Sequence, residues 1–227
     1  MRTTFLFLLC LLTSTPALAL SLADISSSDA VAGLKEALNQ GATNAVGKLG
    51  KADGFLGNPQ VKIPLPDSLQ KASRTLSRFG MGKYADELIV TMNRAAEAAV
   101  PEARELLLNA VKEMSVQDAK SILTGGNTAA TEYFRGKTTQ PLMQKFLPIV
   151  HQATDKVQLA QKYDRFAGKA ERFGLIDKKQ ANLESYVTQK TLDGLFLMMA
   201  EEEKAIRANP IQQTSKLLSK VFGSLLK

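Results

Sequence analysis

The spacing of apolar residues is the feature that most constrains this chain. From Asp29 to Gly50, apolar side chains recur every three or four positions, the period of one face of an α-helix. The members of this first stripe are Val31, Leu34, Leu38, Ala42, Ala45 and Leu49. The same period returns after Pro66 and continues almost to the last residue. The sequence therefore predicts an all-α fold, a multi-helix bundle.

Residues 51–66 interrupt the helical period. Their breakers of regular structure are Gly54, Gly57, Pro59, Pro64 and Pro66. Within the same segment, Val61, Ile63 and Leu65 alternate as they would in an extended strand, and this is the only strand-like stretch in the sequence. Because proline cannot donate to a central strand ladder, we expect one Pro/Gly-rich extended arm or edge segment that wraps over the helical body.

Glycine, proline and capping residues divide the remaining chain into helices. We expect helices over residues 68–79, 83–99, 102–114, 115–124, 128–135, 140–156, 159–173, 183–208 and 210–226. Ser115 and Asp118 have the spacing of a capping box. Val100 precedes Pro101, which disfavours the α region at Val100 and should end the helix before it. Pro148 should kink its helix.

Residues 192–200 are apolar nearly all round, which is typical of a helix at the centre of a bundle. The run is too short to cross a membrane. No fixed-period repeat and no long linker divides the chain. We therefore expect a single domain.

The first 19 residues have the layout of a secretory signal peptide. Arg2 precedes the apolar run 5–12, and residues 17–19 read Ala-Leu-Ala, a small-residue cleavage site. The run is far shorter than the ~20 apolar residues of a spanning helix. We expect cleavage after residue 19 and a periplasmic product, residues 20–227, with a helical core over about 30–223. Leu9 is not small, which disfavours a lipoprotein anchored through Cys10.

Removal of this segment leaves no cysteine and one histidine, His151. Because transition-metal sites rely on thiolates, imidazoles or paired Glu and His, no metal and no cofactor is expected. A Ser-His-Asp triad would need His151, and no G-x-S-x-G turn is present to hold its nucleophile. A structural or surface histidine is favoured over a general base.

The basic residues outnumber the acidic ones. Arg2 is the only charged residue of the predicted signal, so its removal lowers the net charge from +7 to +6. The lysines and arginines stand singly among carboxylates, so specific nucleic-acid binding is not expected. The positive balance favours peripheral contact with anionic envelope components.

The turn Thr124-Gly125-Gly126-Asn127-Thr128 is the most suggestive local candidate for a binding site. Two glycines free the backbone, Asn127 or Thr128 can cap the next helix, and unpaired N–H groups at a helix start attract anions. No strand precedes the turn and no Gly-Lys-Ser/Thr follows it, so it is not a nucleotide-binding loop. An ordinary turn between two helices is the competing interpretation.

A second candidate site is the polar row Asn93, Arg94 and Glu97 in an alanine-rich helix. Because small neighbours permit close helix approach, we expect these polar groups to be half buried and to need partners. The candidate partners are Tyr133, Arg135, Asp193 and Glu202, with the neighbouring Glu201 and Glu203. A buried ion-pair network that fixes packing competes here with a ligand site.

Two features near the C-terminus have simpler interpretations. Glu203 and Arg207, four residues apart, should form a surface pair. The apolar stripe of residues 210–226 either closes the helical core or, with its lysines, lies on a membrane surface.

Several short motifs stand in order along the chain. They are Gly33-Leu34-Lys35-Glu36-Ala37-Leu38, Asp53-Gly54-Phe55-Leu56, Ile63-Pro64-Leu65-Pro66, Met92-Asn93-Arg94-Ala95-Ala96-Glu97, Ile122-Leu123-Thr124-Gly125-Gly126 and Asp193-Gly194-Leu195-Phe196. Over roughly residues 30–223 this ordered set resembles the exported bacterial family catalogued as domain of unknown function 4197. The resemblance implies one helical domain behind a secretion signal. It implies no established activity and therefore no functional residues.

The sequence favours a non-catalytic periplasmic or envelope protein that binds a small anionic or amphiphilic ligand between helices, or a partner protein. The alternative is a hydrolase acting on an envelope substrate, with Glu97 or Asp193 as base and Arg94 or Arg135 holding charge. A purely structural role is the third possibility, and its mark would be a large exposed apolar patch without a cleft.

Overall fold

The computed structural model describes residues 27–176 and 182–208 of the chain. These residues form α1 (Ser27–Leu49), α2 (Asp67–Arg78), α3 (Lys83–Ala99), the short 3-10 helix η2 (Val100–Ala103), α4 (Arg104–Lys112), α5 (Val116–Leu123), α6 (Ala129–Lys156), α7 (Leu159–Arg172) and α8 (Leu183–Ala208). The all-α prediction is confirmed. The predicted signal peptide, Cys10 and the predicted helix 210–226 lie outside the described residues.

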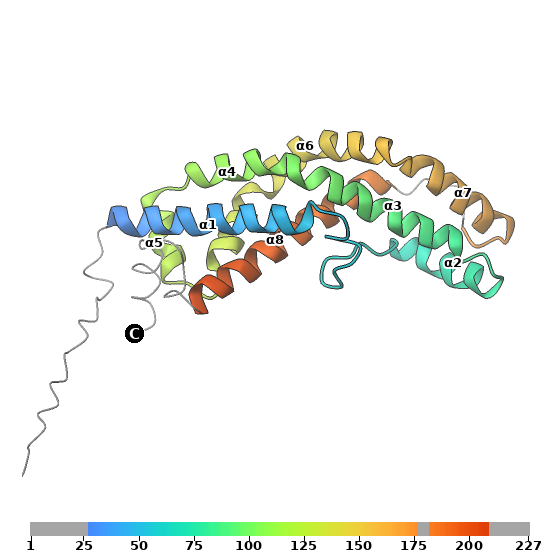
Figure 1. Cartoon of the computed structure of the whole chain (residues 1–227), viewed down its shortest axis with the longest axis horizontal. Helices are drawn as coiled ribbons and strands as arrows, with labels where there is room; N and C mark the ends of the chain where they lie inside the picture. The colour runs from blue at the N-terminus through green and yellow to red at the C-terminus, as the bar shows by residue number, and fades with distance from the viewer. Residues whose placement is uncertain (1–26, 177–181, 209–227) are drawn as a thin grey trace, which may run out of the picture.

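The helices form an elongated bundle (Figure 1). Helix α8 packs against both α1 and α6, while α3 packs against α6 and α7, and α1 also contacts α4 and α5. Helices α2 and α7 lie at one end of the bundle and α5 lies at the other (Figure 1). Residues 192–200 of α8 are buried except for the half-buried Asp193 and Leu197, so the predicted central position of this run is confirmed.

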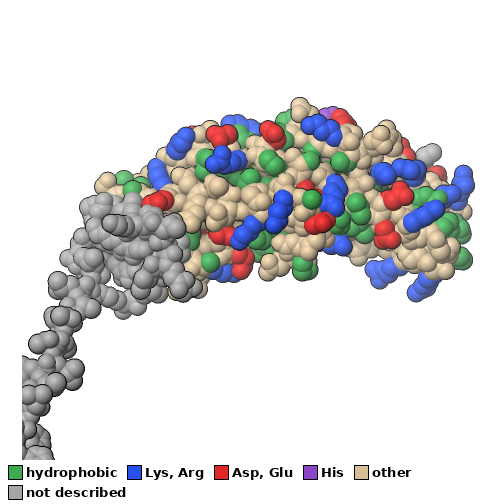
Figure 2. Space-filling model, in the orientation of Figure 1, with side chains coloured by type: hydrophobic (Ala, Val, Ile, Leu, Met, Phe, Trp, Pro, Cys, Tyr) green, Lys and Arg blue, Asp and Glu red, His purple; other side chains and the backbone are tan. Residues whose placement is uncertain are grey.

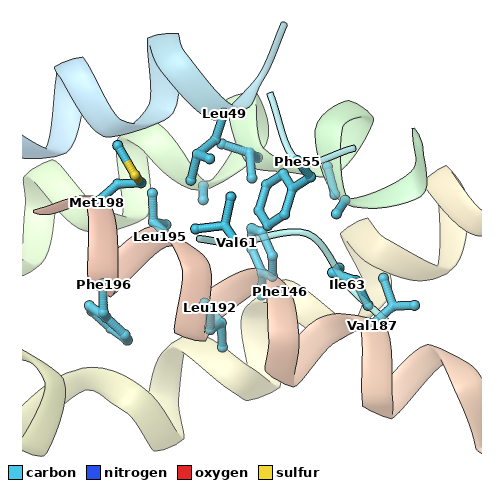
Figure 3. Close-up of a cluster of buried hydrophobic side chains, with 14 of the residues drawn as sticks. Leu49, Phe55, Val61, Ile63, Phe146, Val187, Leu192, Leu195, Phe196 and Met198 are labelled. Carbon is cyan, nitrogen blue, oxygen red and sulfur yellow. The ribbon is translucent and has the colours of Figure 1, made fainter. Parts of the chain in front are cut away.

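Residues 51–66 form the predicted non-helical arm between α1 and α2. The first part, up to Val61, is a series of turns, and only the last few residues are extended, so the arm is less strand-like than expected. The predicted alternation is present there, because Val61, Ile63 and Leu65 are buried while Lys62 and Pro64 are exposed. Within the described residues no β-strand occurs. The arm lies close to α3 and α8, and its buried side chains join the core (Figures 1 and 3).

Phe55 anchors the arm in the core, where its side chain has 0% exposure. Its ring packs on Gly194 of α8, and a Cβ at Gly194 would lie 2.8 Å from Phe55 Cε1. Asp53 has a positive φ of 63°, and a Cβ at Gly54 would lie 2.4 Å from the carbonyl oxygen of Leu49. A tight turn directly after α1 therefore directs Phe55 back into the bundle beside Leu49 (Figure 3).

The predicted end of α3 at Ala99 is confirmed, but the predicted departure of Val100 from the α region is wrong. Val100 has φ −54° and ψ −41°, which is helical, and its N–H still donates to the carbonyl of Ala96. Pro101 lies in the first turn of η2, where its missing N–H costs little, and Val100 and Ala103 are both buried. Packing therefore overrides the preference of a residue before proline, and α3 passes into α4 through one 3-10 turn.

The predicted division of residues 128–156 into two helices is also wrong, because α6 runs unbroken through Pro141 and Pro148. Both prolines are exposed, so they do not disturb the buried face of the helix, which includes Phe134 and Phe146. An internal proline costs ~3 kcal/mol, and the packing of this face against α8 offsets that cost. The predicted capping box of α5, by contrast, is confirmed, with both of its hydrogen bonds present.

No helix among the described residues has the length and apolar content that crossing a membrane requires.

Candidate functional site

Two polar residues of α3 hold the arm by its backbone. The side-chain amide of Asn93 accepts a hydrogen bond from Ile63 N–H at 2.8 Å and donates one to the Ile63 carbonyl at 2.9 Å. Glu97 Oε1 accepts hydrogen bonds from the backbone N–H groups of Phe55 and Leu56, each at 3.0 Å. Asn93 is 0% exposed and Glu97 is 5% exposed. These side chains give the buried arm the hydrogen bonds that a neighbouring strand would otherwise supply.

Arg94 completes this network at the surface. Its guanidinium lies 2.6 Å from Glu97 Oε2 and 2.8 Å from Asp53 Oδ1, so it joins α3 to the turn at the start of the arm. The hydrogen bonds to Glu97 and then to Asp53 raise the pKa of Arg94 above its ordinary value. Of the two interpretations of the polar row, the structure supports a network that fixes packing. Its partners are the arm and Asp53, and not the residues that the sequence suggested.

Two of those suggested partners, Tyr133 and Arg135, lie on α6. Tyr133 is hydrogen-bonded to Asp118, and burial followed by this bond raises the pKa of Tyr133 to about 12. The bond to Ser115, followed by the bond to Tyr133, lowers the pKa of Asp118. The Arg135 guanidinium lies over the ring of Phe196, 5.1 Å from its centroid.

The other two suggested partners, Asp193 and Glu202, lie on α8. Asp193 accepts a hydrogen bond from Gln189 at 2.9 Å, and its side chain is 41% exposed. Glu202 accepts hydrogen bonds from Asn44, at 3.0 Å, and from Lys48. The structure thus divides the predicted cluster into separate contacts.

The anion position predicted at the start of α6 is filled by a carboxylate of the chain itself. Glu203, from α8, accepts hydrogen bonds from Ala130 N–H at 3.1 Å, Thr131 N–H at 2.9 Å and Thr131 Oγ1 at 2.8 Å. Arg207 pairs with the same carboxylate at 2.9 Å and also donates to the Ile122 carbonyl at 3.3 Å. Glu203 therefore supplies the negative charge that the positive end of α6 favours.

The Glu203–Arg207 pair is present, but its predicted surface position is wrong, because the two side chains are 6% and 10% exposed. The turn before α6 is exposed at Thr124, Gly125, Gly126 and Asn127, and Thr128 is half buried. The Thr124 hydroxyl donates to carbonyls of its own helix, and a Cβ at Gly125 would lie 2.6 Å from Ala129 Cβ. These contacts fit the interpretation of this segment as a tight helix-helix connection.

A groove of about 330 Å³ lies between α4 and α6. Buried apolar side chains, among them Met114, Phe134 and Leu142, line it. Lys137 and Lys145 also line it, and they lie eight positions apart on the helix, about 12 Å at the rise of an α-helix. The groove thus combines an apolar floor with two cations on one rim.

Other polar groups complete the rim of this groove. Tyr133 lines it and, with its raised pKa, carries a neutral phenol at physiological pH. The Nζ of Lys137 lies 5.8 Å from the centroid of the Tyr133 ring. Glu113 is the one carboxylate among the lining residues, against Lys137 and Lys145, so the rim has a net positive charge.

The sequence did not indicate this groove because its lining row was divided by a predicted helix break. Tyr133, Lys137, Pro141 and Lys145 follow one another at intervals of four residues, so they share one face of a continuous helix. The predicted break between residues 135 and 140 separated the members of this row. A continuous helix across these residues would have placed both lysines on the same face as the tyrosine.

The single histidine of the chain belongs to a different cluster. His151 Nδ1 lies 2.9 Å from Glu184 Oε1, and Nε2 lies 3.5 Å from Asp155 Oδ2. The hydrogen bond to Glu184, followed by the charges of Glu184 and Asp155, raises the pKa of His151. The His151 side chain is 55% exposed, as expected for a surface histidine.

This cluster borders a hollow of about 430 Å³ that Asp155 and Glu184 help to line. The ligand-type atoms of His151, Asp155 and Glu184 all lie within 4.8 Å of one another, and one imidazole with two carboxylates is a set that divalent metals accept. His151 and Asp155 are exposed and Glu184 is half buried, and His151 pairs with both carboxylates. These ion pairs join the C-terminal part of α6 to the first turn of α8.

Comparison with known proteins gives a family and no activity. The family model described as "Protein of unknown function (DUF4197)" matches residues 24–223, in agreement with the resemblance found in the sequence. No curated protein and no solved structure matches the chain.

Proposed function

The chain belongs to the family described as a protein of unknown function, DUF4197, and we propose that it is a non-catalytic envelope protein that binds a small amphiphile with an anionic head. The observation that carries this proposal is the groove between α4 and α6, with its apolar floor and two lysines on its rim. Its volume of about 330 Å³ lies at the small end of the range of ligand pockets.

The two parts of the groove suit the two parts of an amphiphile. An alkyl chain on Met114, Phe134 and Leu142 gains ~0.8 kcal/mol for each methylene removed from water. A carboxylate or phosphate head accepts hydrogen bonds from Lys137 or Lys145, and Coulomb attraction adds to them. Apolar burial supplies most of the affinity, and the lysines select an anionic head.

The predicted export signal favours an envelope ligand. Residues 1–19 have the charged start, apolar run and Ala-Leu-Ala site of a signal peptide. The proposal therefore locates the protein in the periplasm, where amphiphiles of the envelope are within reach.

The hydrolase alternative has weaker support because its proposed groups already serve the fold. Both Glu97 oxygens accept hydrogen bonds, from the arm and from Arg94. The Arg135 guanidinium lies over Phe196, and Asp193 bonds to Gln189 on its own helix. General acid-base catalysis needs a base within hydrogen-bond reach of its substrate proton, and these contacts hold the candidate bases elsewhere.

Isothermal titration calorimetry with decanoate, decyl phosphate and decanol tests the proposal. The two anions should bind in a saturable one-to-one complex, and decanol, which has the same chain and no charge, should bind more weakly. If decanol binds with the same affinity as the two anions, the lysines do not select an anionic head. Failure of all three probes to bind would reject the proposal.

Three variants locate the site. Lys137→Ala with Lys145→Ala should weaken decanoate binding about three- to tenfold, the range expected for exposed charge pairs. Ala110→Trp, at a half-buried position in the lining, should fill the groove and abolish binding. Lys156→Ala removes an exposed lysine of the same helix outside the groove lining and should leave binding unchanged.

A further inference from the structure

Two phenylalanines stand exposed and stacked at the end of the molecule formed by α2 and α7. Phe79 is 61% exposed and Phe173 is 44% exposed. Their ring centroids lie 5.2 Å apart, with 24° between the ring planes. Single exposed apolar residues are ordinary, whereas a contiguous exposed patch indicates an interaction site.

Phe79 and Phe173 occupy the same place in two copies of one local sequence. Arg78-Phe79-Gly80 ends α2 and Arg172-Phe173-Gly174 ends α7, and the two glycines have positive φ values of 69° and 64°. In each motif the residue after the glycine donates back to a carbonyl of the helix, Met81 to Leu76 at 2.9 Å and Leu175 to Ala170 at 3.0 Å. These are Schellman caps.

The caps fix which apolar residue turns inward. Met81 and Leu175, which follow the glycines, are half buried and pack against the core. The two phenylalanines precede the glycines and remain outside. The caps at the ends of α2 and α7 therefore hold the two aromatic side chains in exposed positions.

Positive charge concentrates around this pair. Residues 71–87 and 159–176 contain eight Lys and Arg and four Asp and Glu, while the rest of the described chain contains fifteen basic and sixteen acidic residues. The eight are Lys71, Arg74, Arg78, Lys83, Lys162, Arg165, Lys169 and Arg172. Figure 2 shows Lys and Arg side chains together with apolar side chains at this end of the molecule.

The two arginines beside the phenylalanines are available to a ligand. Arg78 and Arg172 are exposed, and neither pairs with a carboxylate among the described residues. Arg165, Lys169 and Arg172 also line a shallow hollow of about 500 Å³ beside Tyr84, together with Asp164 and Glu171. In one leaflet of an anionic bilayer, phosphates lie at the surface and acyl chains lie beneath them. The two arginines can contact the phosphates while the two aromatic rings contact the acyl chains.

We propose that the α2 and α7 end of the molecule docks on a bilayer that contains anionic phospholipid, with Phe79 and Phe173 entering the interface. Arg78, Arg172 and the neighbouring lysines contact the lipid phosphates. Each basic residue near an anionic membrane adds to the attraction, and salt screens it. This surface is separate from the groove between α4 and α6, so the two proposals can fail independently.

Co-sedimentation of the purified protein with vesicles tests this docking. The protein should sediment with vesicles of phosphatidylglycerol mixed with phosphatidylcholine, and much less with phosphatidylcholine alone. High salt should reduce the bound fraction. Equal binding to both kinds of vesicle, or to neither, would overturn the proposal.

Variants connect the binding to this end of the molecule. Phe79→Ser with Phe173→Ser, and separately Arg78→Glu with Arg172→Glu, should each weaken vesicle binding by about tenfold or more. Val116→Ser and Lys120→Glu change an exposed apolar and an exposed basic residue of α5, at the opposite end, and should bind as the unchanged protein does. Unchanged thermal unfolding of each variant shows that the fold is kept.

The same variants separate lipid docking from self-association. If the exposed phenylalanines instead join two copies of the chain, sedimentation equilibrium will show a dimer that Phe79→Ser with Phe173→Ser dissociates. Such a dimer without phosphatidylglycerol binding would replace the proposal. A monomer that binds the anionic vesicles through these residues would support it.

Discussion

Gly194 is the residue of α8 at which the arm comes closest to the helical body. A Cβ there would meet Phe55 Cε1 at 2.8 Å and Val61 Cβ at 3.3 Å. Gly194→Ala should therefore destabilise the protein by about 1–3 kcal/mol, because the Phe55 ring is fully buried and has to shift. Urea unfolding followed by circular dichroism measures this loss.

Gly136 provides the matched control for this substitution. It also lies in the interior of a helix, α6, but a Cβ there would meet nothing within 4 Å. Gly136→Ala should stabilise the protein by about 0.5–1 kcal/mol through helix propensity alone. If the two substitutions change stability in the same direction, the close packing of Phe55 on α8 is incorrect.

Glu203 gives a second prediction at the level of one side chain. Glu203→Ala leaves the Arg207 charge, the Ala130 and Thr131 N–H groups and the Thr131 hydroxyl without their buried acceptor. Loss of one member of a buried pair costs about 3–5 kcal/mol, so the unfolding free energy should fall by that amount. Thermal unfolding detects the change.

Glu201 is the control for Glu203. It lies on the same helix and pairs with Lys204, with its side chain 41% exposed. Glu201→Ala should cost at most about 0.5 kcal/mol, as exposed pairs do. A similar loss for both glutamates would show that Glu203 does not cap α6.

At this scale, sequence predicts burial better than it predicts partners. The alanines around Asn93 and Glu97 indicated that these polar groups are half buried and paired, and the structure buries them almost completely. Their partners, the backbone groups of Ile63 and Phe55, lie far away in sequence and carry no chemical signature, because every residue has an N–H and a carbonyl. Only the fold brings them together.

The arm is the element whose position depends most on side-chain hydrogen bonds. Asn93→Ala removes the partners of both backbone groups of Ile63. Hydrogen exchange followed by NMR should then show faster exchange of the Ile63 amide, while the amides of Phe55 and Leu56, held by Glu97, keep more of their protection.

Glu97→Ala is the reciprocal variant. It should expose the amides of Phe55 and Leu56 more than that of Ile63. Uniform loss of protection along the arm in both variants would mean that the arm opens as one unit, and would contradict two separate anchors.

His151 links α6 to α8 and makes the stability of this junction depend on pH. Its pKa is raised above the ordinary 6.5, first by the hydrogen bond to Glu184. The protonated form is therefore favoured by folding, and its contribution is complete below pH 6.5 and is lost as the pH rises through the folded-state value.

NMR titration of His151, the one histidine in the sequence, tests the direction of this pKa shift. The ring resonance should titrate with a midpoint above 6.5, and Glu184→Gln should lower the midpoint. Asp155 remains in that variant, so part of the shift should persist. A midpoint at or below 6.5 in the unchanged protein contradicts the pairing.

At the scale of elements, helix existence could be predicted and helix boundaries only in part. Helices α3 and α8 have the predicted bounds because glycine, proline and apolar spacing agree there. The prediction of non-helical backbone failed at Val100 and at residues 136–139, where the helical conformation continues. The packing of Val100 and of the buried face of α6 keeps the backbone helical at both places. The second error also concealed the groove lysines.

At the scale of the whole molecule, two surfaces of the described residues are candidates for binding. The groove between α4 and α6 has an apolar floor and a net positive rim. The α2 and α7 end carries exposed aromatics beside Arg78 and Arg172, which pair with no carboxylate in the described part of the chain. The polar groups that the sequence offered as a site, Asn93, Arg94 and Glu97, instead hold the arm. We therefore propose that the function belongs to surfaces formed by packing rather than to the polar motifs of the sequence.

Direct observation of an amphiphile in the groove is the most decisive test of this account. Protein labelled with ¹³C at methionine and leucine methyl groups, titrated with decanoate, should show nuclear Overhauser contacts from the alkyl chain to the methyl groups of Met114 and Leu142. Ala110→Trp should remove those contacts. Contacts confined to other methyl groups, or a chain that never gives saturable contacts, would contradict the proposed binding site.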